Sequence, residues 1–471
     1  MQPYDEEYLK EKNIKHMSFH AYVRKLTELH GRGSRTKPLE NVSCKLLDKC
    51  PGGHKPYPKG ICTKCRPTTL TLNRQTYRHV DNVAIENPDV VNKFLNFWRK
   101  SSYQRVGYLI GNYEPFTEVP LGIKAVSDRV KFEEDPNEET VDILCQFLGM
   151  KCVGWIFTDL WSADSKLGTV HCIRHEDSFL LSAAECITAG AFQSKHKNNT
   201  NYCYDGHFGS KFVTVVATGD KSQQINFSGY QVSNQCTAMV DAQILCPTTH
   251  PELAWVRQTP LSEKHYITDV QFTPVYHACL FKPEKNEYGA EVRRDGRPLP
   301  VEFLLVDVPT GMPIQPISSF TVVDDLSVSF PIENRESIGE NQNLQALGRY
   351  MTNFPKNGHF LEIASNFHFL LFLMNNDFVK FAPNEVEQLT KAVKDKNNEA
   401  ANEWAENNAN WATLMELVSA NEAQGGPTQQ NAGGFGNRNV GAGAAKWSCA
   451  HCTFENDGQR ADCAMCGLPQ Q

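Results

Sequence analysis

The sequence predicts an α+β protein of several domains, and three observations support this prediction. A chain of 471 residues is longer than one ordinary domain, so we expect three or four modules. Helical and strand-like patterns alternate through the first half, whereas helical patterns dominate after about residue 332. Four cysteines gather near each end of the chain, and a stretch typical of a flexible linker precedes the second group.

Composition and charge narrow the class of protein. The net charge of −7 comes with no long basic or acidic block, which argues against nucleic acid or an anionic membrane as the main partner. The longest apolar run, residues 367–374, is too short to span a bilayer, so we expect no membrane span. The first residues lack the basic and apolar regions of a secretion signal. We expect a reducing compartment, the cytosol or nucleus, and cysteines that bind metal rather than form disulfides.

The N-terminal segment, residues 1–85, carries the first cysteine cluster after a predicted helix at 17–29. Four ligands complete a closed structural zinc site, and we expect them to be Cys50, His54, Cys62 and Cys65. Turn-forming residues between the two halves favour such a zinc knuckle. Cys44 is a fifth candidate that could replace Cys50 or His54, and a cysteine-rich loop without metal is the alternative.

Residues 86–245 predict an α/β domain because helices and strands alternate densely there. The expected elements are a helix at 87–100, strands at 106–111 and 121–126, a helix at 139–148, and strands at 153–157, 208–218 and 229–236. The scattered cysteines, from Cys145 to Cys279, occur in no protease-like signature. We expect them to be small buried hydrophobic residues.

The C-terminal domain, expected over 246–420, begins with a strand at 301–308 and then becomes helical. A strongly apolar helix is expected at 359–372. The next helix is expected to start with Asn384 as its N-cap and Glu387 three residues later. A further apolar helical face is typical of a core and indicates no site; it consists of Trp404, Trp411, Leu414 and Val418.

Residues 421–446 are rich in Gly, Gln, Asn and Ala without an apolar period, and they predict a flexible linker with a reach of about 25–30 Å. Residues 447–471 follow with the spacing C-x2-C-x10-C-x2-C, formed by Cys449, Cys452, Cys463 and Cys466. Two such knuckles bind one zinc ion through four thiolates, and so short a segment depends on the metal to fold. We therefore expect two structural Zn²⁺ ions in the whole chain.

This C-terminal module resembles the NZF-type zinc finger, a small zinc ribbon that binds ubiquitin. Thr453 and Phe454 after the first knuckle, and Met465 inside the second, match that family's ubiquitin-contacting positions. An exposed Phe beside an exposed Met forms an apolar patch, from which we expect weak binding. In one alternative Phe454 packs on Trp447. In another the ribbon binds RNA, although RNA-binding relatives present Arg and stacking aromatic residues instead.

The middle of the chain resembles the MPN domain of JAMM metallo-isopeptidases with its catalytic groups replaced. In that family a Glu precedes a G-x-L-x-G strand, V-G-W-x-H-x-H-P supplies two zinc ligands, and S-x2-D supplies the third. Here Gln104 stands in place of the Glu, and Phe157 and Asp159 stand in place of the two histidines. Residues 182–185 correspond to the third motif, after an insertion at about 161–179. The resemblance implies a catalytically dead MPN domain, because Gln is no base and Phe binds no zinc.

An active JAMM-type zinc isopeptidase with rearranged ligands is the alternative function. His171 and His175 lie in the insertion beside Glu176, with an H-x3-H spacing that can bind metal on a helix. Two histidines are a weak signal, and we expect them to be surface residues of a polar loop. We therefore predict no catalytic residues and no enzyme.

The order of cysteine knuckle, degenerate MPN domain and NZF-type ribbon resembles one family, the nuclear protein localization protein 4 homologs. The matching stretches extend over nearly the whole chain apart from the linker, and they lie at residues 15–19, 72–75, 77–82, 154–160, 205–212 and 330–335. Members of this family usually begin with a ubiquitin-like domain and a further zinc knuckle. This chain starts after both, as a short isoform, a fragment or a divergent member would.

The resemblance implies the function of a non-catalytic adaptor. Family members pair with ubiquitin fusion degradation protein 1 and deliver polyubiquitinated proteins to the AAA ATPase valosin-containing protein. There the clients are unfolded for proteasomal degradation, including ER-associated degradation. The implied location is the cytoplasm and nucleus and, through partners, the cytosolic face of the endoplasmic reticulum.

Overall fold

The computed structural model describes the chain outside residues 1–5, 12–13, 30–36, 47–49, 51, 56–58, 61, 63–68, 114–121, 127–136, 165–166, 263–264, 272–295, 313–318, 321–329, 333–339, 355–359, 425–446, 449–454 and 457–471. The chain divides into two compact units, Met1–Asn421 and Glu422–Gln471. Within the described residues, no helix is long and apolar enough to cross a membrane.

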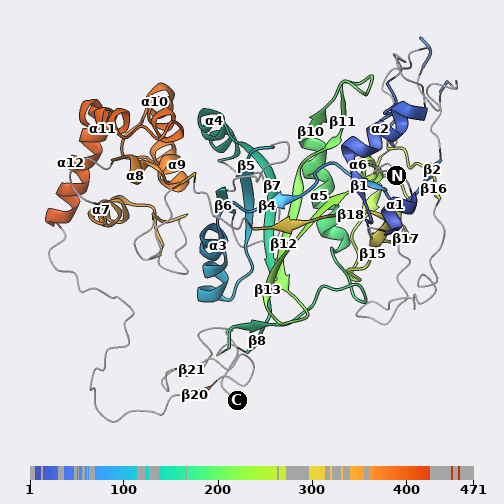
Figure 1. Cartoon of the computed structure of the whole chain (residues 1–471), viewed down its shortest axis with the longest axis horizontal. Coiled ribbons are helices and arrows are strands. Elements are labelled where there is room, and N and C mark those ends of the chain that lie inside the picture. The colour runs from blue at the N-terminus through green and yellow to red at the C-terminus, as the bar shows by residue number, and fades with distance from the viewer. Residues whose placement is uncertain are drawn as a thin grey trace. The chain divides into compact units, whose positions relative to one another are not determined.

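A six-stranded mixed sheet is the largest sheet of the first unit (Figure 1). Its strands lie in the order β18-β13-β12-β7-β5-β6. Strands β7 and β12 are parallel neighbours, and all other neighbours are antiparallel. The strands are β5 (Val106–Gly111), β6 (Gly122–Val126), β7 (Lys151–Asp159), β12 (Val213–Gly219), β13 (Ile225–Val232) and β18 (Leu305–Val308).

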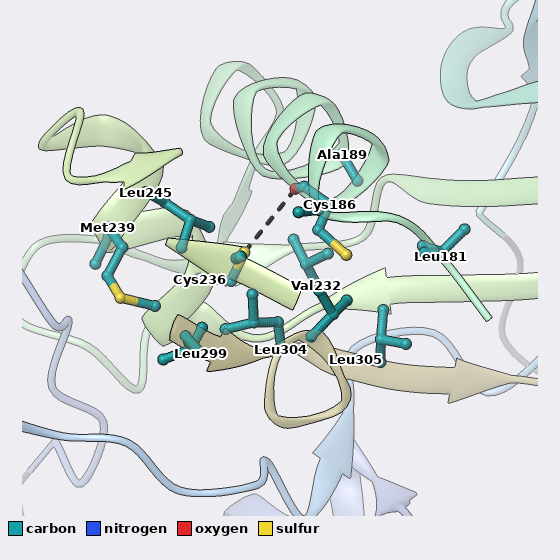
Figure 2. Close-up of a cluster of buried hydrophobic side chains, with 14 of the residues drawn as sticks. Leu181, Cys186, Ala189, Val232, Cys236, Met239, Leu245, Leu299, Leu304 and Leu305 are labelled. Atoms are coloured by element: carbon teal, nitrogen blue, oxygen red, sulfur yellow. Dashed lines mark hydrogen bonds between the residues drawn. The ribbon is translucent and has the colours of Figure 1, made fainter. Parts of the chain in front are cut away.

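Two helices, α5 (Ala183–Lys195) and α6 (Asn234–Asp241), cover one face of this sheet. Their buried side chains pack with Trp155, Phe157 and Val232 from the strands. Figure 2 shows part of this cluster, in which Val232 lies among side chains of both helices. The helices are held by burial of apolar surface, the main driving force for such packing.

The other face is covered by α3 (Pro88–Ser101). Successive side chains of a strand point to opposite faces, and the two middle strands follow this rule. Ile156 of β7 and Val215 of β12 join the cluster of α3, whereas Val216 joins the cluster of α5 and α6. Both strands are therefore buried on both sides, which explains why their sequences are almost continuously apolar.

Local capping fixes where several helices begin and end. The side chain of Asn87 accepts a hydrogen bond from the backbone at the start of α3. Ser182 and Glu185 form a capping box at the start of α5. Helix α4 (Glu138–Leu148) ends at Gly149, whose φ of 71° is readily adopted by glycine.

The N-terminal region packs on the sheet through short strands and one helix. Strand β1 (Met17–Ser18) pairs in parallel with β3 (Tyr77–Arg78), and α2 (Phe19–Leu29) follows directly. The rings of Tyr22 and Tyr77 stack with their centroids 3.9 Å apart. Further elements are α1 (Glu6–Glu11), β2 (Leu70–Thr71) paired with β16 (Val270–Gln271), and β4 (Val83–Ala84) paired with β19 (Thr310–Gly311).

Four small sheets complete the described strands. They are β8 (Ser162–Asp164) with β9 (Thr169–Val170), β10 (Lys197–Asn199) with β11 (His207–Ser210), β15 (Leu253–Arg257) between β14 (Leu245–Cys246) and β17 (Gly296–Pro300), and, in the second unit, β20 (Trp447–Ser448) with β21 (Glu455–Asn456).

The C-terminal part of the first unit is helical. Its apolar side chains form one core with Leu144 and Leu148 of α4. Trp404, Trp411, Leu414 and Val418 are all buried in this core, as the sequence predicts. The helices are α7 (Leu344–Thr352), α8 (Phe360–Ala364), α9 (Phe367–Asn375), α10 (Pro383–Lys394), α11 (Asn398–Asn407) and α12 (Ala409–Gln424).

Other element predictions for the α/β part are also confirmed. The strand predicted at 106–111 is β5, and the strand predicted at 153–157 lies inside β7. The helices predicted at 87–100 and 139–148 match α3 and α4 to within one residue at each end. The strand predicted at 121–126 is β6, which begins at Gly122.

Two predictions for the helical part are wrong. The apolar helix expected at 359–372 is two helices, because Asn366 caps α9 by accepting hydrogen bonds from the two backbone amides His368 N and Phe369 N. The N-cap of α10 is Ala382 and not Asn384. The carboxylate of Glu385 accepts the hydrogen bond of Ala382 N at 2.6 Å, so the N-cap lies two residues before the predicted one, and Glu387 lies inside the helix.

Five strand, helix or linker boundaries also differ from prediction. The strand expected at 208–218 is divided into β11 and β12, and the strand expected at 229–236 ends at Val232 because Ser233 caps α6. The strand expected at 301–308 starts with a 3₁₀ turn, Val301–Phe303. The helix expected at 17–29 begins only at Phe19, after β1, and α12 continues through the first residues of the predicted linker to Gln424.

Replacing Gly154 by Ala should destabilise the sheet. A Cβ atom at this position would lie 2.5 Å from Val213 O and 2.7 Å from Val213 Cγ2, so β7 and β12 would have to separate. We expect the free energy of unfolding to fall by about 1–3 kcal/mol in denaturant titrations of the full chain. Gly311→Ala is the matched control, since nothing lies within 4 Å of its Cβ position. Equal stability losses in the two variants would contradict the close approach.

Candidate functional site

Three of the predicted zinc ligands lie together. The ligand atoms of Cys50, His54 and Cys62 are all within 4.8 Å of one another, and within the described part of the chain this is the one group of three possible metal ligands. Cys50 Sγ lies 3.3 Å from His54 Nε2 and 3.5 Å from Cys62 Sγ. The fourth predicted ligand, Cys65, lies outside the described residues.

The backbone around Cys50 folds into a tight turn that presents its thiol. Gly53 N donates to Cys50 O at 3.0 Å, and Gly52 N donates to Cys50 Sγ at 3.3 Å. Gly53 has a φ of 75°, which side chains other than glycine rarely adopt. A hydrogen bond from backbone N–H to sulfur favours the thiolate, the form of cysteine that binds metal.

The orientation of His54 suits a metal ligand. His54 Nδ1 lies 2.6 Å from Lys55 O. A carbonyl oxygen can only accept, so Nδ1 carries the proton and Nε2 presents its lone pair to the thiols of Cys50 and Cys62. Thiolate sulfur and imidazole nitrogen are the ligands that zinc prefers, so the three side chains fit three of the four positions of a structural zinc site.

Cys44, the fifth candidate, is not part of this cluster. It is 3% exposed and packs in the large hydrophobic core with Leu70 and Leu72. Burial raises the pKa of its thiol to about 11, which opposes the thiolate that a metal needs. Its backbone oxygen accepts a hydrogen bond from Thr268 Oγ1 at 3.1 Å. The contacts of Cys44 are therefore those of a core residue.

A second group of polar residues lies where β7 ends. Gln104 Nε2 donates to Leu160 O at 2.7 Å, and Leu160 N donates to Gln104 Oε1 at 3.1 Å. Both ends of the Gln104 amide are thus bound to the backbone of one residue. The side chain closes the loop after β7, and no proton-accepting group is present at this position.

Arg174 joins the two acidic residues of this group. Its Nε donates to Asp159 Oδ2 at 2.6 Å, and its two terminal nitrogens donate to the two oxygens of Glu185 at 2.8 and 2.7 Å. The guanidinium carbon also lies 5.3 Å from the centre of the Phe157 ring. The predicted positions Phe157, Asp159 and Glu185 therefore meet, and they meet around an arginine.

Arg174 was not predicted as a site residue from the sequence. Its partners are 15 and 11 residues away in the chain, so no short motif contains all three. A signal was nevertheless present: Asp159 and Glu185 occupy positions of metal ligands in the resemblance, and Arg174 is the one arginine in the insertion between them. Two carboxylates that meet without a metal are stabilised by another cation or by a shared proton.

The histidines of the insertion form no helix and no metal cluster. Residues 171–178 are loop, turn and bend, so the H-x3-H spacing does not place His171 and His175 on one helical face. The His171 ring contacts the Trp161 ring at a centroid distance of 5.4 Å. The Nδ1 atom of His175 accepts a hydrogen bond from Asp177 N at 3.2 Å. Neither histidine belongs to a group of three ligands in the described residues.

Four of the scattered cysteines are buried as small hydrophobic residues, whereas Cys152, Cys172 and Cys246 are only half-buried, contrary to the expectation. Cys186 and Cys236 are completely buried side by side, and Cys236 Sγ points to the backbone oxygen of Cys186 at 3.9 Å (Figure 2). Burial raises the pKa of both thiols well above their usual value, so neither is a thiolate at neutral pH. Cys145 and Cys203 are buried as well, and Cys279 lies outside the described residues.

The predicted site of the C-terminal ribbon lies outside the described residues. This holds for all four cysteines and for the three positions matched to ubiquitin contacts, namely Cys449, Cys452, Cys463, Cys466, Thr453, Phe454 and Met465. The second unit shows one antiparallel pairing, in which Trp447 lies opposite Asn456 and Ser448 opposite Glu455.

Fold and cluster together define a mixed α/β protein with an N-terminal metal-binding region and a helical C-terminal part. Residues 105–419 match the model of the NPL4 family, and residues 1–102 match the model of the region of that family to which zinc binding is ascribed. The chain belongs to the NPL4 family.

Curated relatives agree with this assignment over nearly the full chain. The chain is 54% identical to nuclear protein localization protein 4 homolog 1 of Caenorhabditis elegans, over 99% of this chain and 90% of the relative. It is 42% identical to the Homo sapiens homolog, over 100% of this chain and 76% of that relative. It is 35% identical to nuclear protein localization protein 4 of Saccharomyces cerevisiae, over 88% and 73%. These names describe localization proteins and not enzymes.

Replacing Gly60 by Ala should weaken zinc binding at the N-terminal cluster. A Cβ atom at this position would lie 2.4 Å from His54 Nδ1 and 2.4 Å from Lys55 O. The hydrogen bond that orients His54 would therefore break, and we expect a loss of about 10–100-fold in zinc affinity, measured by competition with a chelator. Gly52→Ala is the comparison variant in the same turn: its Cβ would lie in ordinary contact with His54 and Cys50, at 3.4 Å or farther, so we expect a smaller loss of affinity. Unchanged affinity in Gly60→Ala would argue against His54 as a ligand.

Proposed function

We propose that the chain is a non-catalytic adaptor that recruits substrates to an ATPase. It binds polyubiquitinated proteins and, together with ubiquitin fusion degradation protein 1, delivers them to the AAA ATPase valosin-containing protein. The clients are then unfolded for proteasomal degradation, including ER-associated degradation. Membership of the NPL4 family supports this role, and the adaptor works in the cytoplasm and nucleus and, through its partners, at the endoplasmic reticulum.

The observation that carries the non-catalytic part is the ion pair network at the end of β7. A metallo-isopeptidase needs three ligands around a zinc with an open position, and a base beside it. Here the guanidinium of Arg174 lies between Asp159 and Glu185, and Gln104 is bound to the loop backbone. We therefore assign this region to a degenerate MPN domain, residues 86–245, that serves as a binding scaffold.

Two structural zinc ions complete the proposal. The first is held by Cys50, His54, Cys62 and Cys65 in the N-terminal segment, residues 1–85. The second is held by four thiolates in an NZF-type ribbon, residues 447–471, which follows a C-terminal domain (246–420) and a linker (421–446). The match to the family's zinc region and the geometry of Cys50, His54 and Cys62 support the first site. The spacing of Cys449, Cys452, Cys463 and Cys466 supports the second.

Two cysteine variants should separate the two halves of the adaptor. Each is tested in co-purification of the full chain with valosin-containing protein, ubiquitin fusion degradation protein 1 and polyubiquitin. In the proposal the N-terminal knuckle faces the ATPase, as the family resemblance implies, so Cys62→Ser should reduce retention of the ATPase and leave polyubiquitin binding by the ribbon. Cys463→Ser should do the reverse, so each variant is the control for the other. If the unmodified chain retains no ATPase, even with its partner present, the adaptor role is wrong.

An isopeptidase with rearranged ligands makes the opposite prediction about chemistry and metal. We expect the purified chain to release no ubiquitin from a polyubiquitin chain, with or without chelator, and to contain two zinc ions. Chelator-sensitive release of ubiquitin would refute the non-catalytic role. A third zinc ion that is lost in His171→Ala would refute it as well.

The ubiquitin contact of the ribbon can be tested on the full chain. Thr453→Ala combined with Phe454→Ala removes the hydroxyl and the ring that match the ubiquitin-contacting positions, and we expect a loss of at least tenfold in affinity for ubiquitin by titration. Gln459→Ala, within the ten residues between Cys452 and Cys463, is the control and should bind as the unmodified chain does. Unchanged affinity in the double variant would remove these residues from the contact.

A further inference from the structure

An arginine in the segment between β9 and α5 binds both the sheet and the helix, in addition to the burial of Leu181 in the core. Arg174 lies in this segment, Asp159 is the last residue of β7, and Glu185 lies in the first turn of α5. We propose that Arg174 is a built-in counter-ion, which holds these three elements together and occupies the space in which the two carboxylates would otherwise bind a metal cation.

The geometry is that of a fully engaged guanidinium. It makes a two-pronged contact with Glu185, at 2.8 and 2.7 Å, and a separate contact with Asp159 at 2.6 Å. One terminal nitrogen also donates to Leu180 O at 2.8 Å. Charged hydrogen bonds of this length, with a planar fork against a carboxylate, are the strong kind. A lysine, with one point charge, could not make all of these contacts.

Because Arg174 is buried, its charge and the charges of Asp159 and Glu185 stabilise one another. The side chain of Arg174 is 5% exposed, and its guanidinium contacts the rings of Phe157 and Phe179 at 5.3 and 4.9 Å. Burial of a charge is costly unless it is paired. Within the described residues, neither Asp159 nor Glu185 has an ion pair with any other Lys or Arg. Removing the arginine therefore leaves two like charges that face one another without a cation.

Glu185 couples this network to the start of the helix. Its carboxylate also accepts the backbone N–H of Ser182 at 2.8 Å, and its own N–H donates to Ser182 Oγ at 3.3 Å. The same carboxylate thus caps α5 and binds Arg174. Loss of the arginine should disturb both the segment before the helix and the first turn of the helix.

This role rests on the proposed function only for the comparison with a metal site. The role of Arg174 is tested by folding stability, whereas the adaptor function is tested by co-purification. A negative result in either experiment leaves the other conclusion standing.

The test is whether the effect of Arg174→Ala changes sign when its partners are neutral. In the unmodified chain we expect Arg174→Ala to lower the midpoint of thermal unfolding. In a chain that carries Asp159→Asn and Glu185→Gln, the arginine is a buried charge without a counter-ion, so Arg174→Ala should raise the midpoint. An arginine that acts only by filling space would lower the midpoint in both backgrounds. An equal loss in the two backgrounds overturns the proposal.

Further variants keep the test decisive. If Arg174→Ala fails to fold in the unmodified chain, the direction of the change in the neutral background still decides. Arg174→Lys keeps the charge without the fork and should fall between the unmodified chain and Arg174→Ala. Arg74→Ala is the matched control: it also pairs with a glutamate, at 2.8 Å, and contacts the ring of Phe303, but its side chain is 61% exposed. We expect it to shift the midpoint little.

Discussion

The structure depends on the parallel pairing of β7 with β12. Parallel neighbours cannot be joined by a tight turn, so the chain between them must cross over the sheet. This crossover contains the insertion, α5 and β11, and α5 covers one face of the two strands. The end of β7 at Asp159 and the first turn of α5, which begins at Ala183 after β8 and β9, come together because Arg174 binds both Asp159 and Glu185. Gly154 permits the approach, since a Cβ there would meet Val213.

The same crossover decides the chemistry at the end of β7. It places two carboxylates, Asp159 and Glu185, beside one another under a segment that supplies Arg174. A guanidinium fills this place, whereas thiols and an imidazole gather in the N-terminal cluster. Thiolate and imidazole are the usual ligands of structural zinc, whereas the planar guanidinium of an arginine matches the geometry of carboxylates. Within the described residues, the group of three possible metal ligands thus lies outside the six-stranded sheet.

Sequence patterns predict most elements here but fail where chemistry is distributed along the chain. The bounds of β5 follow from its apolar pattern, and the Cys50, His54 and Cys62 cluster follows from short spacing. The start of α10 was wrong because Glu385 completes a cap on Ala382, which has no capping side chain of its own. Spacing alone could not distinguish Cys44 from the other candidate zinc ligands, since its burial depends on distant residues of the core. Arg174 was not predicted for the same reason: its partners are distant in the sequence.

The polar side chains at the end of β7 are hydrogen-bonded within the chain, and this limits the chemistry that the domain can perform. Catalysis by a metal needs an open coordination position and a free base. In such a site some polar groups have no partner within the chain until the substrate binds. Here the Gln104 amide is bound at both ends by Leu160, and Arg174 is bound by both carboxylates and Leu180. These groups are all engaged within the chain, as the proposed function expects of a scaffold. Under that proposal, binding partners are recognised on the outer surfaces of the domain.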